Sequence, residues 1–195
     1  MTRLPGRAEF APLSIELWLR LMAEALPAIH DVPLATPQRR YRPYYDPRTR
    51  NAPAWSKQPK AWRHALDLAR SRQPRTTSRF IHRDYHPWNI LWQRGKLSGV
   101  VDWISACAGP PQVDVAHCRV NLVWFHGLDV ADRFLAAYAD ASGSSVEDYD
   151  PYWDAMALAD TGLVIADIPW FDAGLTLPLV RRRLDALAVA IAGLS

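Results

Sequence analysis

The stretch FIHRDYHPWNILW, residues 80–92, sets two histidines, an aspartate and an asparagine among apolar residues. Four residues separate Asp84 from Asn89, and Asp102 follows thirteen residues after Asn89. An amide oxygen and a carboxylate that converge on one point are hard oxygen ligands, which suit Mg²⁺ with phosphate oxygens completing its shell. A nearby carboxylate outside the metal shell could orient a hydroxyl group and accept its proton. The spacing therefore indicates the parts of a phosphoryl-transfer site.

A β-hairpin is the element expected to gather these groups. The short apolar segments NILWQ and LSGVVDW predict two strands, and the residues RGK between them predict a turn through Gly95. A hairpin places the segment before its first strand beside the segment after its second strand. Asn89 and Asp102 should then lie together, with Asp84 a few ångströms away.

Helical patterns account for most of the remaining chain. We expect helices within residues 14–32, 59–72, 108–127, 129–143, 152–167 and 177–193. Residues 31–60 are rich in proline and should form an ordered but irregular segment. A chain of 195 residues is long enough for one domain of good size. We therefore predict a single domain over residues 1–195, of the α+β class and mostly helical.

Several classes of protein are excluded by the sequence. No apolar run approaches the roughly 18 residues that a membrane span needs. The first residues, MTRLPGRAEFAPLS, lack the apolar core of a signal peptide. Two cysteines, Cys107 and Cys118, do not make a disulfide framework. We therefore expect a cytoplasmic protein without a membrane partner.

Charge is unevenly distributed along the chain. Residues 39–83 carry thirteen Lys or Arg against two acids, but they match no known nucleic-acid motif. We expect this basic block to be a solvated surface segment with no nucleic acid bound. Residues 84–180 carry four Lys or Arg against thirteen acids, which could attract a cationic acceptor. The acids in question include Asp148, Asp150, Asp154, Asp160, Asp167 and Asp172.

The motif and its surroundings resemble a known family. The spacing of His82, Asp84 and Asn89 matches the protein-kinase catalytic loop, and a second metal-binding aspartate follows. The longer pattern HRDYHPWNILW, GVVDW and GPPQVDVA is similar to the aminoglycoside phosphotransferase family, relatives of choline and homoserine kinases. That family has the forms H-G-D-x-H-x-x-N, I-D-W and G-x-P-x-x-D-x-A. The resemblance covers about residues 12–170 and implies a protein-kinase-like C-terminal lobe.

The resemblance also implies roles for the oxygen-bearing residues. Asp84 would orient and deprotonate the hydroxyl of a small acceptor. Asn89 and Asp102 would hold Mg²⁺ against the phosphates of ATP or GTP. The implied activity is transfer of the γ-phosphate to that hydroxyl, and a cationic acceptor is one candidate.

Supporting roles follow from the same resemblance. His82 and His86 would brace the loop through hydrogen bonds. Asp114 would accept backbone N–H groups and lock the loop in place, or would be a plain helix N-cap. Arg83 stands where the family usually has glycine, and we expect it to make a surface or carboxylate contact.

The family's N-terminal lobe is the part that the sequence does not match. We find no Gly-rich loop, and the two lysines before the motif, Lys57 and Lys60, lie in the proline-rich segment. We therefore expect a truncated enzyme with its N-terminal lobe absent. Its exposed lobe face would be covered by a separate N-terminal lobe or by a second copy of the chain.

Two alternatives to an active kinase stay open. One is a non-catalytic lobe that binds or regulates a partner. The other is a metal-dependent phosphoesterase in which His82, Asp84 and His86 chelate a transition metal. The second alternative leaves the spacing of Asn89 and Asp102 unexplained.

Overall fold

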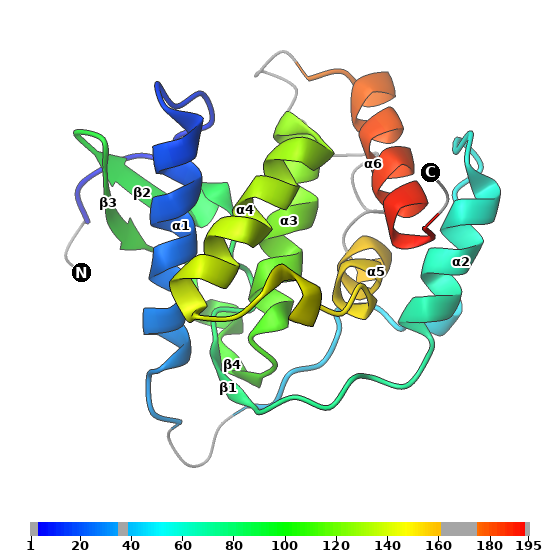
Figure 1. Cartoon of the computed structure of the whole chain (residues 1–195), viewed down its shortest axis with the longest axis horizontal. Coiled ribbons are helices and arrows are strands. Elements are labelled where there is room, and N and C mark those ends of the chain that lie inside the picture. The colour runs from blue at the N-terminus through cyan, green and yellow to red at the C-terminus, as the bar shows by residue number, and fades with distance from the viewer. Residues whose placement is uncertain (1–3, 35–38, 161–174, 194–195) are drawn as a thin grey trace.

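The computed structural model describes residues 4–34, 39–160 and 175–193 (Figure 1). Helices dominate this part of the chain, and the strands form two small antiparallel pairs, so the prediction of a mostly helical α+β fold is confirmed. The helices are α1 (Ile15–His30), α2 (Pro59–Ala69), α3 (Gln112–His126), α4 (Leu128–Ser142), α5 (Tyr152–Asp160) and α6 (Leu177–Ile191). The strands are β1 (Arg79–Ile81), β2 (Ile90–Gln93), β3 (Lys96–Val100) and β4 (Cys107–Gly109).

The helix ends follow local sequence signals. The Ser14 side chain accepts a hydrogen bond from the Leu17 N–H and caps α1, and Thr176 caps α6 in the same way. Gly127 and Gly143 end α3 and α4 with positive φ angles of 98° and 66°, which glycine adopts without strain. The expected continuation of α5 beyond Asp160 lies outside the described residues.

The predicted hairpin is present as β2 and β3. Ile90 pairs with Val100 and Gln93 with Lys96, and both residues of the two-residue turn have positive φ angles. Such turns match the right-handed twist of the flanking strands. The second strand ends at Val100, two residues before Asp102, so it is shorter than the sequence suggested.

A second pair of strands, β1 and β4, was not anticipated. Arg79 pairs with Gly109 and Ile81 with Cys107. This ladder joins the residues that enter the loop at residues 82–89 to the residues that lead into α3. It therefore fixes both sides of the candidate site, although each strand has only three residues.

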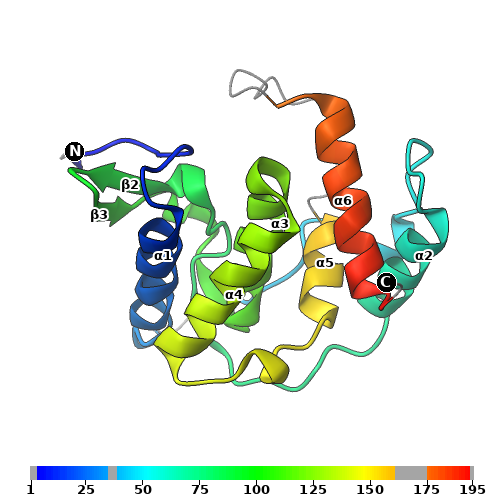
Figure 2. The same cartoon turned by 45° about the horizontal axis from the view of Figure 1, so that its top comes forward.

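The helix α3 is the centre of the helical part. Its residues from Val113 to Val123 are all buried, which is typical of a helix surrounded by other elements. It packs against α4, α5 and α6, while α1 packs on α4 and α2 packs on α5 and α6. Figures 1 and 2 show α1 with the β2–β3 hairpin on one side of α3, and α2 with α6 on the other.

A buried ion pair fastens α3 to its neighbours. The guanidinium of Arg119 donates to both carboxylate oxygens of Asp154 on α5 at 2.9–3.1 Å, and to the Ala131 carbonyl on α4 at 2.8 Å. The Tyr149 hydroxyl donates to the same carboxylate at 2.7 Å. The four groups hold three helices in one arrangement.

The proline-rich segment is ordered by contacts with distant residues. Apart from one 3₁₀ turn, η1 (Pro47–Thr49), its described residues are irregular up to Gln58, and α2 begins at Pro59. The irregular segment is therefore slightly shorter than the predicted 31–60.

Within the described residues, no helix combines the length and apolar character needed to cross a bilayer.

Candidate functional site

The loop between β1 and β2 carries the polar motif. It runs from His82 to the short 3₁₀ turn η2 (Pro87–Asn89), and it lies between the β1–β4 ladder and the β2–β3 hairpin. Asp84 is partly exposed, with 28% of its side-chain surface accessible, whereas His82 is fully buried. The loop thus presents one carboxylate to solvent on a buried base.

His82 connects the two halves of the loop region. Its Nδ1 accepts a hydrogen bond from the Asp84 backbone N–H at 3.3 Å, and its Nε2 lies 2.9 Å from the Val101 carbonyl oxygen. Burial lowers the pKa of His82, which favours the neutral ring with the proton on Nε2. The ring therefore ties the backbone of Asp84 to the residue just before Asp102.

Asp114 is the anchor of the loop. Its carboxylate is fully buried and accepts hydrogen bonds from the backbone N–H groups of His82 at 2.8 Å and Arg83 at 2.7 Å. The His30 Nε2 lies 3.2 Å from the same carboxylate. The N-cap position of α3 belongs to Pro111, so Asp114 does not cap its own helix. Its hydrogen bonds instead join α3 and α1 to the loop.

Two histidines hold the carboxylate of Asp84. The Oδ1 atom lies 3.1 Å from His117 Nε2 and 3.5 Å from His86 Nε2. Burial alone would raise the pKa of Asp84, but the hydrogen bonds from His117 and His86 outweigh it and hold the pKa well below its usual range. Burial lowers the pKa of His117. Asp84 is therefore an ionised hydrogen-bond acceptor at neutral pH.

His117 is the site residue that the sequence analysis missed. It lies on α3, three residues after Asp114, so helical spacing puts both side chains on the same face toward the loop. That spacing was the available signal. The donor atoms of Asp84, His86 and His117 lie within 4.8 Å of one another. His82 is not part of this cluster, because its two nitrogens face Asp84 N and Val101 O, so the predicted His82–Asp84–His86 chelate is wrong in that residue.

Asn89 lies directly beside Asp84. Its side-chain nitrogen donates to the Asp84 carbonyl at 2.9 Å and to the Asp84 carboxylate at 3.1 Å. The nitrogen is thereby committed to Asp84, and the side-chain oxygen is the atom that can bind a cation. Asp84, the residue expected to bind the acceptor hydroxyl, thus also orients Asn89.

Asp102 follows the hairpin in a left-handed conformation, with a φ angle of 64°. The Val101 N–H donates to the Asn89 carbonyl at 2.8 Å, so the segment before Asp102 runs beside Asn89. Asp102 is exposed, and no hydrogen bond or ion pair among the described residues engages its carboxylate. A carboxylate and an amide oxygen are the kinds of ligand that suit Mg²⁺.

The conformation and contacts of Arg83 account for an arginine at a position where the family usually has glycine. Its φ angle is 73°, in the left-handed region that glycine adopts most readily. Its guanidinium is buried, donates to Asp160 at 2.7 Å and lies 3.8 Å from the centre of the Tyr44 ring. The expected carboxylate contact is therefore present, whereas a surface contact is not.

Comparison with known proteins places this site in a family context. The sequence model described as "Phosphotransferase enzyme family" matches residues 1–158. No curated protein matches the chain significantly.

Solved structures share the fold at low sequence identity. A thermostable mutant of aminoglycoside phosphotransferase APH(4)-Ia, in a ternary complex with AMP-PNP and hygromycin B, matches 98% of this chain and 71% of its own, with 18% identity and a TM-score of 0.62. Spectinomycin phosphotransferase APH(9)-Ia, with ADP and spectinomycin, matches 98% of this chain and 69% of its own, at 13% identity and a TM-score of 0.54. Macrolide 2'-phosphotransferase MphH from Brachybacterium faecium matches 82% of this chain and 68% of its own, at 16% identity and a TM-score of 0.50. These likenesses show the fold.

Proposed function

Since the chain belongs to the phosphotransferase enzyme family, we propose that it transfers the γ-phosphate of ATP or GTP to a hydroxyl group of a small molecule. The observation that carries the proposal is Asp84, an ionised and partly exposed carboxylate held by His117 and hydrogen-bonded to Asn89. Two of the solved structures named above, those of APH(4)-Ia and APH(9)-Ia, contain AMP-PNP or ADP, which supports a nucleotide as the donor.

Asp84 positions the acceptor more than it activates it. The carboxylate accepts a hydrogen bond from the acceptor hydroxyl and turns its oxygen toward the γ-phosphate. A carboxylate with a lowered pKa is a weak base at neutral pH, so it receives the proton only as the O–P bond forms. Phosphoryl transfer has a loose transition state in which orientation matters more than base strength. The contact with His117 keeps the carboxylate from turning away.

Asn89 and Asp102 would hold Mg²⁺ in this proposal. The bound metal would neutralise charge on the phosphates during transfer. Both residues are held in place by the protein. Asn89 is fixed by its hydrogen bonds to Asp84, and His82 fixes the backbone before Asp102. Asp114 acts one step further back by holding the backbone of His82 and Arg83.

The test is a phosphate-transfer assay with the purified 195-residue chain. Mg-ATP or Mg-GTP is mixed with a panel of hydroxyl compounds, and phosphorylated product is measured by mass spectrometry. Asp84→Asn should reduce product formation by at least a hundredfold, the usual range for loss of a positioned acid–base group. Asp129→Asn is the matched control, since Asp129 lies exposed on α4 and, within the described residues, its carboxylate is paired with Arg133.

The first alternative is a non-catalytic lobe. The same assay distinguishes this alternative from the kinase proposal. If no acceptor is phosphorylated while the chain still binds Mg-ATP or a partner protein, catalysis by this chain is refuted. If product forms equally in Asp84→Asn and in the unchanged chain, the assignment of Asp84 is wrong.

A metal-dependent phosphoesterase is favoured by one observation, the cluster of Asp84, His86 and His117. Ligands at about 2.0–2.1 Å from Zn²⁺ stand about 3.3–3.4 Å apart in a tetrahedron. The distances of 3.1 and 3.5 Å from Asp84 to the two histidines are close to that value. Titration with Co²⁺, read by its visible spectrum, should give a tetrahedral signal that His117→Ala removes if this alternative holds. No such signal would exclude it.

A further inference from the structure

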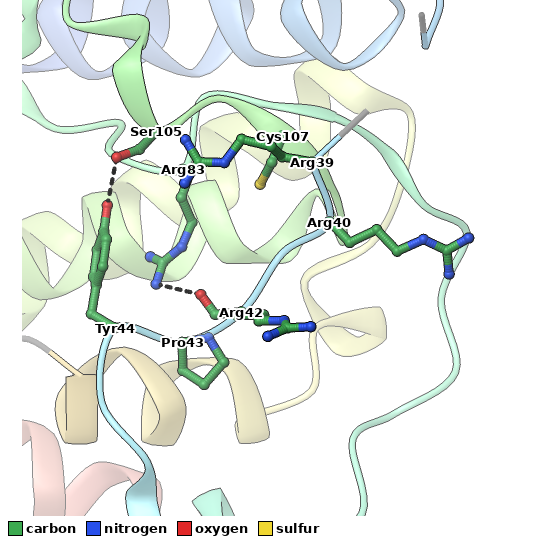
Figure 3. A pocket seen from close by; sticks show the side chains of 8 residues that line it. All are labelled: Arg39, Arg40, Arg42, Pro43, Tyr44, Arg83, Ser105 and Cys107. Atoms are coloured by element: carbon green, nitrogen blue, oxygen red, sulfur yellow. Dashed lines mark hydrogen bonds between the residues drawn. The ribbon is translucent and has the colours of Figure 1, made fainter. Parts of the chain in front are cut away.

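A basic pocket opens beside the candidate site. It has a volume of about 650 Å³, and no acidic residue is among its eight lining residues. Half of these residues are arginines, and an aromatic hydroxyl and a serine complete one wall. The residues that carry the argument are Arg39, Arg40, Arg42, Arg83, Tyr44 and Ser105. Figure 3 shows Arg40 and Arg42 extending to one side of their segment, while the Tyr44 ring and the head of Arg83 lie together on the other.

Two pocket residues are close in sequence to the two carboxylates of the site. Arg83 directly precedes Asp84, and Ser105 ends the short 3₁₀ turn η3 (Trp103–Ser105) that directly follows Asp102. Two of the residues that line the pocket therefore directly adjoin the candidate site along the chain.

The segment that carries the arginines is held in place. The Tyr41 N–H donates to the Ala108 carbonyl at 2.8 Å, and the Ala108 N–H donates to the Arg39 carbonyl at 2.7 Å. The Tyr44 hydroxyl donates to Ser105 at 3.1 Å, and the Tyr45 N–H donates to Asp160 at 2.8 Å. The pocket wall is thus ordered before any ligand binds, which reduces the entropy lost on binding.

The positive charge of the pocket is mostly uncompensated. Arg83 is paired with Asp160 behind the wall, so its charge is neutralised. Arg39 donates one bond to the Ile104 carbonyl, while the guanidinium groups of Arg40 and Arg42 are exposed and form no ion pair within the described residues. Guanidinium groups bind carboxylate and phosphate through paired N–H donors.

The acids that suggested a cationic acceptor are engaged elsewhere. Asp154 is paired with Arg119, and Asp160 with Arg83. Asp150 accepts from the Tyr152 N–H, and Asp148 accepts from the Ser145 N–H. Asp167 and Asp172 lie outside the described residues. The four described acids of this set therefore serve helix caps and internal ion pairs, whereas the exposed side chains of Arg39, Arg40 and Arg42 carry positive charge.

We propose that this pocket binds an anionic group, a phosphate or a carboxylate, of the hydroxyl compound that Asp84 orients. The role as acceptor pocket rests on the proposed function. The exposed guanidinium groups of Arg39, Arg40 and Arg42 supply the positive charge that attracts this anion, and the acceptor hydroxyl is directed toward the loop.

The experiment measures binding without nucleotide, by ligand-observed NMR titration at constant ionic strength. The probes are glycerol 3-phosphate, glycerate and 2-aminoethanol, and the first two distinguish a phosphate from a carboxylate. We expect one or both anionic probes to bind and 2-aminoethanol not to bind. The variant Arg40→Gln/Arg42→Gln should weaken binding of the anionic probe at least tenfold. The control Arg63→Gln/Arg72→Gln removes the same charge from exposed positions outside the pocket and should leave binding unchanged.

Three results would overturn the inference: tighter binding of 2-aminoethanol, an equal loss in the control variant, or displacement of the anionic probe by Mg-ATP. The last result would assign the pocket to the nucleotide. Anion binding without phosphate transfer would refute the proposed function alone, whereas transfer to cationic acceptors that is insensitive to Arg40→Gln/Arg42→Gln would refute the pocket alone.

Discussion

Two aspartates of this site should separate stability from activity when each is changed to asparagine. Asp114 is fully buried and accepts hydrogen bonds from the backbone N–H groups of His82 and Arg83. Asp102 is exposed and has no polar partner among the described residues. Asparagine removes the charge at both positions with almost no change of shape, and it tolerates the left-handed conformation of Asp102.

The magnitude follows from the hydrogen bonds that each change removes. Asp114→Asn turns one acceptor oxygen into an NH₂ group, so one buried N–H loses its partner, at about 1–3 kcal/mol. The remaining bond loses its charge assistance, which is worth about 1 kcal/mol more. We expect the free energy of unfolding to fall by about 3 kcal/mol. Asp102→Asn should change it by less than about 0.5 kcal/mol, as is usual for exposed positions.

Urea unfolding followed by tryptophan fluorescence measures both variants. With a slope of about 2 kcal/mol per molar urea, Asp114→Asn should lower the midpoint by about 1.5 M. The phosphate-transfer assay should show the opposite order, with Asp102→Asn the more damaging change when Asp114→Asn is assayed well below its unfolding temperature. Equal midpoints for the two variants would refute the anchoring role of Asp114. A lower midpoint for Asp102→Asn would show that its carboxylate has a structural partner.

Further predictions concern the interior and its pH dependence. Asp154→Ala should lower the free energy of unfolding by about 3–5 kcal/mol in urea, because the buried Arg119 loses its main counter-charge. Burial lowers the pKa values of His82 and His117, so the unfolded chain takes up protons first as pH falls below about 6.5. The free energy of unfolding should therefore decrease by up to about 2.7 kcal/mol per pH unit in that range, as measured by urea titrations between pH 5 and 7. The pKa of Asp84 is lower in the folded state than in the unfolded chain, where it is near 4. Ionised Asp84 therefore stabilises the folded state above about pH 4, and this contribution is lost as pH falls through the folded pKa. The stability difference between Asp84→Asn and the unchanged chain should accordingly be constant from pH 5 to 8 and should shrink at pH 3 in guanidinium titrations.

Local signals were sufficient for much of the fold. The hairpin followed from two apolar segments around a short turn, and Ser14, Gly127 and Gly143 marked helix ends as capping residues do. The relative placement of Asp84 and Asn89 also followed from local spacing, because both lie in one short loop. These features depend on residues close together in the sequence, where the physical rules are strongest.

Long-range contacts were the part that the sequence could not supply. Arg83 pairs with Asp160 across 77 residues of chain, and His82 bonds to Asp114 across 32. The β1–β4 ladder likewise pairs residues 79–81 with residues 107–109, which are far apart in the sequence. Such pairs are set by how helices pack, and a single sequence holds no record of packing. His117 is intermediate, because helical spacing places it beside Asp114 once the orientation of Asp114 is known.

Different residues hold the loop at residues 82–89 and line the basic pocket. The loop at residues 82–89 is held by Asp114, His82 and His117, none of which lines the basic pocket. The pocket arginines instead lie on residues 39–42, a segment that β4 and Asp160 hold from outside. Arg83 is the one residue that belongs to both, and its charge is already neutralised by Asp160. Substitutions at residues 39–42 should therefore change anion binding while the geometry around Asp84 stays intact, so the two proposals can be tested separately.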